Sequence, residues 1–229
     1  MTLRQLLKTI GSGAAIVALG MFIASPRGQA SGENDDRNGR NDDESRIKRG
    51  FAIAPVPLNM EGKNPALVGL GSYIVNAVAD CNGCHSAGPP TEFARGGNPY
   101  FGQPTKINTA TYLAGGRDFG PLIPGTPDII SRNLTPDKTG MPEGGHTFEE
   151  FLQILRTGVD MDHLHPPCSA TVTTNCLPPP FDGNLLQVMP WPIHHNMTTH
   201  DIRAIYEYLS AIPCNAGPPA PSPLHNDCE

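Results

Sequence analysis

The sequence has few aromatic and few basic residues. Aromatic side chains make up 6% of the 229 residues, and all hydrophobic types together make up 38%. Protein side chains alone would give a thin core for this length, and a large buried apolar cofactor would account for the difference. Lys and Arg number 16 against 22 Asp and Glu. Because no basic stripe runs along the chain, we expect no nucleic-acid partner.

An apolar run of membrane-spanning length is also missing. The run at residues 10–24 is about 15 residues long, whereas a membrane-spanning helix needs roughly 20. Arg4 and Lys8 precede this run, and a small-x-small cleavage site ends at Ala30. We therefore predict that residues 1–30 are a signal peptide and that the protein is periplasmic or otherwise exported. The alternative is an uncleaved anchor, the one case in which we expect membrane association.

Residues 31–49 contain almost no apolar side chains. They hold six acids, five bases and one aliphatic residue. Such a segment cannot bury enough surface to order itself. We predict a disordered charged tether between the signal peptide and the folded part.

Glycine and proline are abundant, with 25 of each, and they predict long ordered loops. Three segments between the loops repeat apolar residues with the helical period, namely residues 64–79, 147–156 and 200–211. The first contains Gly69 and Gly71, which are unfavourable inside a helix. These glycines indicate that another helix crosses closely there.

Residues 81–85 read Cys-Asn-Gly-Cys-His, the C-x-x-C-H signature of c-type haem attachment. Two thiols three positions apart on a helical turn can add to the two vinyl groups of a haem, and the next imidazole can ligate the iron. We therefore predict one covalent haem c, held by Cys81 and Cys84, with His85 as an iron ligand.

Three other interpretations of the motif compete with haem. A zinc site would need two more soft ligands, and the chain has no second C-x-x-C. A thioredoxin-type pair would follow a strand and begin a helix, whereas here a predicted helix comes first and Gly-Pro follows. The third alternative is a structural disulfide between Cys81 and Cys84. The predicted export favours haem over all three.

Five stretches of the chain match one family in the family's order. They are GLGSYIVNAVADCNGCH, FARGGNPYFG, NLTPDKTG, HTFEEFLQILRTGVD and VMPWPIHHNMTTHDIRAIYEYLSAIP. On these stretches, Leu67 to Pro213 resembles the monohaem class I cytochromes c, especially the cytochrome subunits of periplasmic alcohol, aldehyde and sugar-acid dehydrogenases. The resemblance implies a mainly α, class I cytochrome c-like helical domain over residues 50–213, with long Gly/Pro-rich loops. Residues 163–184, a Cys- and Pro-rich insertion, depart from the family pattern.

The resemblance also implies a crossing of the N-terminal and C-terminal helices beside the haem. Gly69 and Tyr73 in the first helix match that crossing, as do Tyr206 and Leu209 in the last.

The family's axial methionine corresponds to Met189, and Pro190 after it stiffens the backbone that aims the thioether. We therefore expect Met189 to be the second iron ligand. The other candidates within the mature chain are Met60, Met141, Met161 and Met197. Ligation by a second histidine, from His194 or His195, and a five-coordinate iron are the remaining alternatives.

Four further cysteines allow three disulfide pairings. We favour Cys168–Cys176 inside the insertion and Cys214–Cys228, which pins a C-terminal tail of residues 214–229, because both close local loops. A redox-active dithiol or a second metal site is the functional alternative.

These features predict an electron carrier rather than an enzyme, either a free carrier or the cytochrome subunit of a dehydrogenase. A haem enzyme with an open iron site and a gas-binding sensory module are the alternatives. The partners we expect are redox proteins. Residues 1–30 hold three bases and no acid, so removing them changes the formal charge from −6 to −9. Such a surface would steer a cationic partner.

Overall fold

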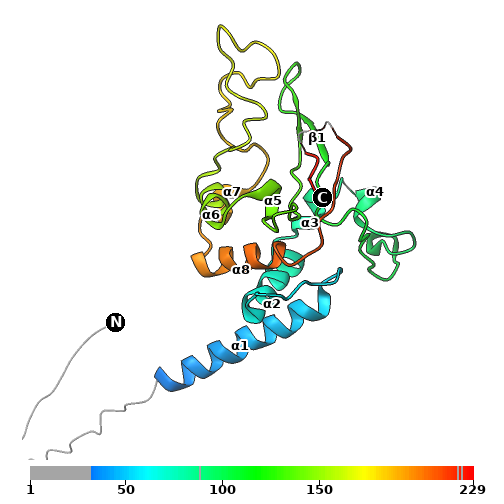
Figure 1. Cartoon of the computed structure of the whole chain (residues 1–229), viewed down its shortest axis with the longest axis vertical. Helices are drawn as coiled ribbons and strands as arrows, with labels where there is room; N and C mark the ends of the chain where they lie inside the picture. The colour runs from blue at the N-terminus through cyan, green and yellow to red at the C-terminus, as the bar shows by residue number, and fades with distance from the viewer. Residues whose placement is uncertain (1–31, 88, 221, 223) are drawn as a thin grey trace, which may run out of the picture.

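The computed structural model describes residues 32–87, 89–220, 222 and 224–229 (Figure 1). The predicted signal peptide lies outside these residues. Helical elements and one two-stranded sheet are joined by long loops. In chain order the elements are α1 Gly32–Ile53, α2 Pro65–Tyr73, η1 Ile74–Val78, α3 Cys81–His85, α4 Pro89–Glu92, η2 Pro99–Phe101, β1 Asp118–Pro121, β2 Asp128–Ile130, α5 Pro142–Gly145, α6 Phe148–Thr157, α7 Trp191–His194 and α8 Thr199–Leu209. Within this part of the chain, no helix is both long and apolar enough to cross a membrane.

The first predicted helix is present, but it changes form along its length. Asn64 caps it, since its side-chain oxygen accepts a hydrogen bond of 3.0 Å from the Ala66 N–H. From Ile74 the helix widens into a π-helical segment, η1, that ends at Val78. The α-helical part is therefore shorter than predicted.

Both later helices begin at the threonines that precede them in the sequence. Thr147 and Glu150 form a capping box at the start of α6, and Gly158, with a φ of 71°, ends that helix. Thr198 accepts a hydrogen bond of 3.0 Å from the Asp201 N–H at the start of α8. The two predicted helices are confirmed.

Helices α2 and α8 cross at Gly71. A Cβ on Gly71 would lie 1.9 Å from the Ala204 carbonyl oxygen and 2.7 Å from the Cβ of Tyr208, so no side chain fits. The inference that glycine marks a close helix crossing is confirmed. The prediction that Gly69 makes this contact with the last helix is wrong, because Gly69 faces α1 instead.

Helix α1 occupies the segment that we expected to be a disordered tether, residues 31–49, and that prediction is wrong for residues 32–49. The helix packs against α2 (Figure 1). A Cβ on Gly50 would lie 1.8 Å from the Gly69 carbonyl oxygen, and the Ser72 hydroxyl donates a hydrogen bond of 2.7 Å to the Gly50 carbonyl. The last turns of the charged segment thus gain a packing surface on α2, which composition alone does not reveal.

The buried core lies where α2, η1, α6 and α8 meet. A hydrogen-bonded group within it satisfies two tyrosine hydroxyls. The Tyr112 hydroxyl donates to the Asn76 side-chain oxygen over 2.6 Å and lies 2.8 Å from the Tyr208 hydroxyl. Both tyrosines are at most 2% exposed, so each hydroxyl needs such a partner. The fully or nearly fully buried apolar members around this group are Val68, Val75, Leu113, Ile202 and Leu209.

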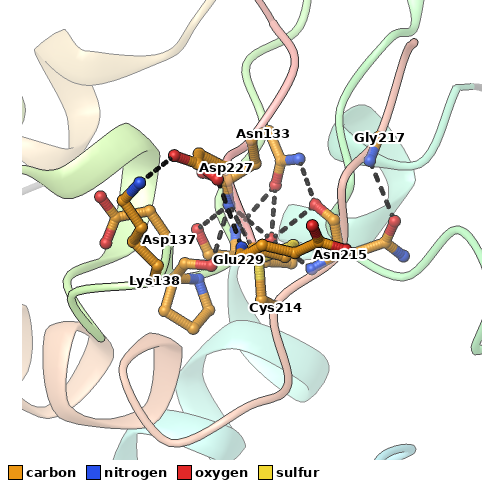
Figure 2. The surroundings of a disulfide bond; sticks show 12 residues. Asn133, Asp137, Lys138, Cys214, Asn215, Gly217, Asp227 and Glu229 are labelled. Atoms are coloured by element: carbon orange, nitrogen blue, oxygen red, sulfur yellow. Dashed lines mark hydrogen bonds and ion pairs between the residues drawn. A yellow bond between two sulfur atoms is a disulfide. The ribbon is translucent and has the colours of Figure 1, made fainter. Parts of the chain in front are cut away.

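Both predicted disulfides are present. The Cα atoms are 4.9 Å apart in Cys168–Cys176 and 5.7 Å apart in Cys214–Cys228. The second bond fixes the C-terminal tail beside residues 133–138 (Figure 2). There the Asn226 side-chain amide donates to the carbonyls of Thr135 and Pro136 over 3.0 and 2.9 Å. Two disulfides are consistent with an exported protein.

Candidate functional site

A cavity of about 1270 Å³, open solvent at its mouth included, lies between α3, α6, α8 and the loops on the opposite side. Most of its lining is apolar. Cys81, Cys84 and His85 open into it together with Met189. The structure therefore brings the four predicted site residues to one cavity.

Helix α3 carries the C-x-x-C-H motif and is fixed by backbone and side-chain contacts. Asp80 before it adopts a left-handed conformation with a φ of 48°, so the chain turns between η1 and α3. The Asn82 side-chain oxygen accepts a hydrogen bond of 3.0 Å from the Leu113 N–H, and the His85 carbonyl accepts one of 2.7 Å from the Gly115 N–H. These bonds hold the motif against the cavity.

The His85 ring is buried and oriented. Its Nδ1 lies 2.7 Å from the Arg132 carbonyl oxygen. Because a carbonyl only accepts, Nδ1 carries the proton and Nε2 keeps its lone pair. Burial lowers the pKa of His85 to about 4, so the ring is neutral at neutral pH. A neutral imidazole whose second nitrogen donates to a carbonyl is the usual state of a metal-ligating histidine.

The two motif thiols are free, whereas the other four cysteines are paired. Burial raises the pKa of the Cys81 thiol to about 12, with the Asp80 carboxylate and Cys84 adding to the shift. Redox-active thiols have lowered pKa values. The environment of Cys81 therefore disfavours the thioredoxin-type interpretation.

Two methionines line the cavity, Met189 and Met197. Met161 lines a separate small pocket next to it, and Met60 and Met141 are not among the cavity residues. The cavity thus narrows the five candidates for the axial thioether to two.

His194 and His195, which follow the Met189 loop, lie in different surroundings. His194 lines the cavity, and burial lowers its pKa. His195 is held elsewhere, since its Nδ1 lies 2.6 Å from the Arg156 carbonyl oxygen. Of the pair, His194 is the one placed to act as an alternative ligand.

The Cys/Pro-rich insertion forms part of the cavity wall. Leu164, His165 and Leu177 from the insertion line the cavity, together with Phe119 and Ile129 from the β1–β2 hairpin. The insertion and the hairpin extend from the same side of the molecule (Figure 1). Sequence reasoning missed this role because the insertion has no counterpart in the resembling family and no periodic pattern.

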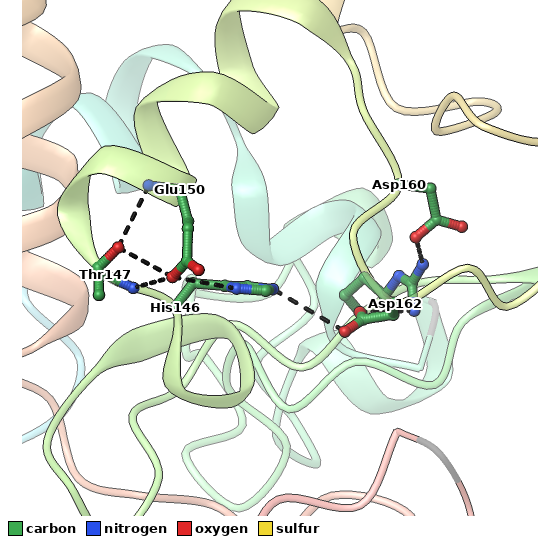
Figure 3. Close-up of polar contacts among 6 residues, drawn as sticks. His146, Thr147, Glu150, Asp160 and Asp162 are labelled. Carbon is green, nitrogen blue, oxygen red and sulfur yellow. Dashed lines mark hydrogen bonds and ion pairs between the residues drawn. The ribbon is translucent and has the colours of Figure 1, made fainter.

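A charged cluster, defined here as Arg132, Glu143, Asp160 and Asp162, adjoins the same wall. The Arg132 guanidinium pairs with the Asp160 carboxylate and lies 2.9 Å from that of Asp162 (Figure 3). Arg132, Glu143 and Asp160 line the cavity. No sequence pattern marks this cluster, since Arg132, Glu143 and the Asp160–Asp162 pair come from separate parts of the chain and fit no motif.

Comparison with family models, with curated proteins and with solved structures finds no match to this chain. Within the described residues, no three His, Cys, Asp or Glu side chains come together in a way that could hold a metal ion. The zinc interpretation of the motif therefore lacks its further ligands there.

The residues around the cavity fit a haem. A large apolar space receives two free thiols, one oriented neutral imidazole and two thioethers. These are the groups that attach and ligate a c-type haem.

Proposed function

We propose that the protein is an electron-transfer c-type cytochrome that carries one covalent haem in this cavity. Cys81 and Cys84 would hold the haem, and His85 and Met189 would ligate its iron. One observation carries the proposal: the C-x-x-C-H thiols and the oriented His85 ring open into the same large apolar cavity as Met189. The crossing of α2 and α8 at Gly71 supports the class I cytochrome fold that the resemblance implies.

The bound haem supplies one-electron chemistry at its iron. The chain contributes attachment, orientation and exclusion of water. Cys81 and Cys84 would hold the haem covalently through their thiols, one on each vinyl group. The Arg132 carbonyl fixes the His85 tautomer, and the apolar lining would limit the access of water to a bound haem. Met189 as the second ligand would raise the potential and would occupy the iron position that a substrate would otherwise need.

We further propose that the protein works in the periplasm or an equivalent exported location. There it would pass electrons between redox proteins, either as a free carrier or as the cytochrome subunit of a dehydrogenase. The two disulfides support an exported location, and the acidic charge would suit a cationic redox partner.

The attachment is tested by expressing the full chain with a bacterial c-type haem maturation system and staining denaturing gels for haem. We expect the stain to stay on the wild-type band, to be weakened or lost in Cys84→Ser, where only the Cys81 thioether can form, and to be lost in His85→Ala. Colour that extracts into acidic acetone from the wild type would refute the proposal.

The second iron ligand is tested by three parallel variants, Met189→Ala, Met197→Ala and His194→Ala. We expect only Met189→Ala to abolish the sulfur-to-iron charge-transfer band of the oxidised protein and to admit added cyanide. Loss of the band in Met197→Ala alone would assign the ligand to the other methionine. A wild type that lacks the band would contradict thioether ligation.

A further inference from the structure

Two carboxylates other than Glu143 already balance the positive charge of Arg132. Its guanidinium pairs with Asp160 and with Asp162, and the side chains of Arg132 and Asp160 are only 12% and 8% exposed. Two carboxylates thus already face one cation. A third carboxylate at the same place has no positive charge left to itself, and a buried carboxylate in that position tends to bind a proton.

Glu143 is that third carboxylate, and it belongs to the cavity wall. Its backbone adopts a left-handed conformation, with φ 53° and ψ 51°, which is unfavourable for a residue with a side chain. This backbone turn lies between Pro142, which is buried, and Gly144, which is exposed. Glu143 itself is half-buried, so the fold places this acidic side chain at the border between the cavity and solvent.

We propose that Glu143 is a redox-linked proton site, which takes up one proton from water when an electron enters the cavity and releases it when the electron leaves. This inference rests on the proposed cytochrome function. The electron would come from a one-electron donor protein and leave to a one-electron acceptor protein. On reduction the iron goes from ferric to ferrous, and one O–H bond forms on the Glu143 carboxylate. On oxidation that bond breaks and the proton returns to water.

The physical cause is the electrostatic interaction between the iron site and the Glu143 carboxylate, which the apolar cavity screens poorly. An added electron makes the iron site more negative by one unit charge, and a nearby negative charge raises the proton affinity of a carboxylate. Burial raises the pKa of Glu143 to about 7, with Asp162 and Asp160 adding to the shift and Arg132 opposing it. Both protonation states are therefore populated near neutral pH, where a modest change in the field shifts the proton.

Other titratable groups face the same space and must be distinguished from Glu143. Those of the cavity and the adjoining small pocket, apart from the charged cluster and the motif itself, are Asp80, His146, His165 and His194. His146 also approaches the cluster directly, since its Nε2 lies 3.9 Å from the Asp162 carboxylate (Figure 3). A variant at Glu143 alone separates its contribution from theirs.

The test measures the midpoint potential of the purified holoprotein as a function of pH, by spectroelectrochemical titration. In the wild type we expect the potential to fall as the pH rises through about 7, the pKa of Glu143, because deprotonated Glu143 disfavours the reduced iron. Glu143→Gln should give a flat profile over that range. Glu149→Gln, on the exposed side of α6, is the matched control and should keep the wild-type slope.

Redox-induced infrared difference spectra give an independent measurement. Reduction of the wild type should produce the carbonyl band of a protonated carboxylic acid, and Glu143→Gln should lack it. A flat wild-type potential, a slope that survives in Glu143→Gln, or a wild-type spectrum without the band would each overturn the proton site. Should Glu143→Gln fail to fold, Glu143→Ala gives the same comparison, and absence of the band in the wild type still overturns the proton site.

Failure of the proton site and failure of the cytochrome function look different. Haem that is missing from the denatured wild-type band refutes the proposed function before any titration begins. A covalent haem with a pH-independent potential refutes only the role of Glu143.

Discussion

The two sides of the cavity are built by different physical means. The helical side, formed by α3, α6 and α8, presents regularly spaced apolar side chains such as Phe151, Leu155 and Ile205. The loop side, formed by the β1–β2 hairpin, residues 131–143 and residues 159–190, carries the charged cluster and the Cys168–Cys176 disulfide. Apolar packing thus fixes one side, whereas ion pairs and a covalent bond fix the other. Substitutions on the two sides should therefore differ in size and in their response to pH.

The largest effect is expected on the loop side, for Arg132→Met. This change removes the partner of Asp160, whose side chain is 8% exposed, and leaves a buried carboxylate without its cation. We expect a loss of about 3–5 kcal/mol in the free energy of unfolding, measured by urea titration.

The matched control is Lys138→Met, because Lys138 forms an ion pair of 2.5 Å with Asp227 in which the side chains are 54% and 58% exposed. That change should cost less than about 1 kcal/mol. Equal losses in the two variants would mean that the charged cluster contributes no more than a surface ion pair.

The next effect is expected on the helical side, for Gly71→Ala. The new Cβ would lie 1.9 Å from the Ala204 carbonyl oxygen, so α2 and α8 must move apart. Overpacking of this kind costs about 1–3 kcal/mol, and urea unfolding measures it.

Gly69→Ala is the control on the same helix. Its new Cβ would lie 2.7 Å from the Ile47 Cγ2, 2.8 Å from the Phe51 ring and 2.9 Å from the Ile47 carbonyl oxygen on α1, so it overlaps α1 less deeply than Gly71→Ala overlaps α8. Both variants gain the same helix propensity, so the difference between them isolates the α2–α8 crossing. A greater loss in Gly69→Ala would place the critical helix contact at α1.

The same contrast explains how much could be predicted from the sequence. The caps at Thr147 and Thr198 and both disulfides were predicted correctly as local features, because each depends on residues close together in the chain. Local patterns also placed a glycine at a helix crossing. They did not say which helix each glycine faces, since α1 and α8 approach α2 from different sides.

The remaining features depend on contacts between distant segments. Arg132 and Asp160 are 28 positions apart, and nothing in either neighbourhood marks a partner. At residues 31–49 the sequence predicted too little structure, because the contacts of this segment with α2 were not visible in its composition. Its composition predicts disorder, but Gly50 and Ser72 bring its last turns onto α2. Composition describes a segment in water, whereas α2 offers it a surface to pack against.

A smaller effect, specific to the loop side, concerns pH. The folded protein raises the pKa of Glu143 to about 7 from the ordinary value of 4.5. The folded state therefore binds more protons than the unfolded state between these values, so this group's contribution to stability is full below about 4.5 and is lost as the pH rises through about 7. Glu143→Gln, which stays neutral, should be more stable than the wild type at higher pH by on the order of 2 kcal/mol, and should match it in acid. Thermal unfolding over this pH range measures the difference. A constant offset at all pH values would show that the substitution acts through packing rather than through charge.

The smallest effect returns to the helical side, for Thr147→Ala. The Thr147 hydroxyl accepts from the Glu150 N–H over 3.3 Å, and the Glu150 carboxylate accepts from the Thr147 N–H over 2.8 Å. Alanine leaves the first turn of α6 without its side-chain acceptor, and we expect a loss of about 1 kcal/mol in urea unfolding. Thr139→Ala is the loop-side counterpart, because the Thr139 hydroxyl also makes a local hydrogen bond, donating to the Asp137 carboxylate over 2.5 Å, but in an exposed turn that caps no helix. That change should be nearly neutral, since water replaces the lost bond at no net cost. If Thr139→Ala is as destabilising as Thr147→Ala, local hydrogen bonds stabilise the loop side as much as the helices, and the division between the two sides does not hold.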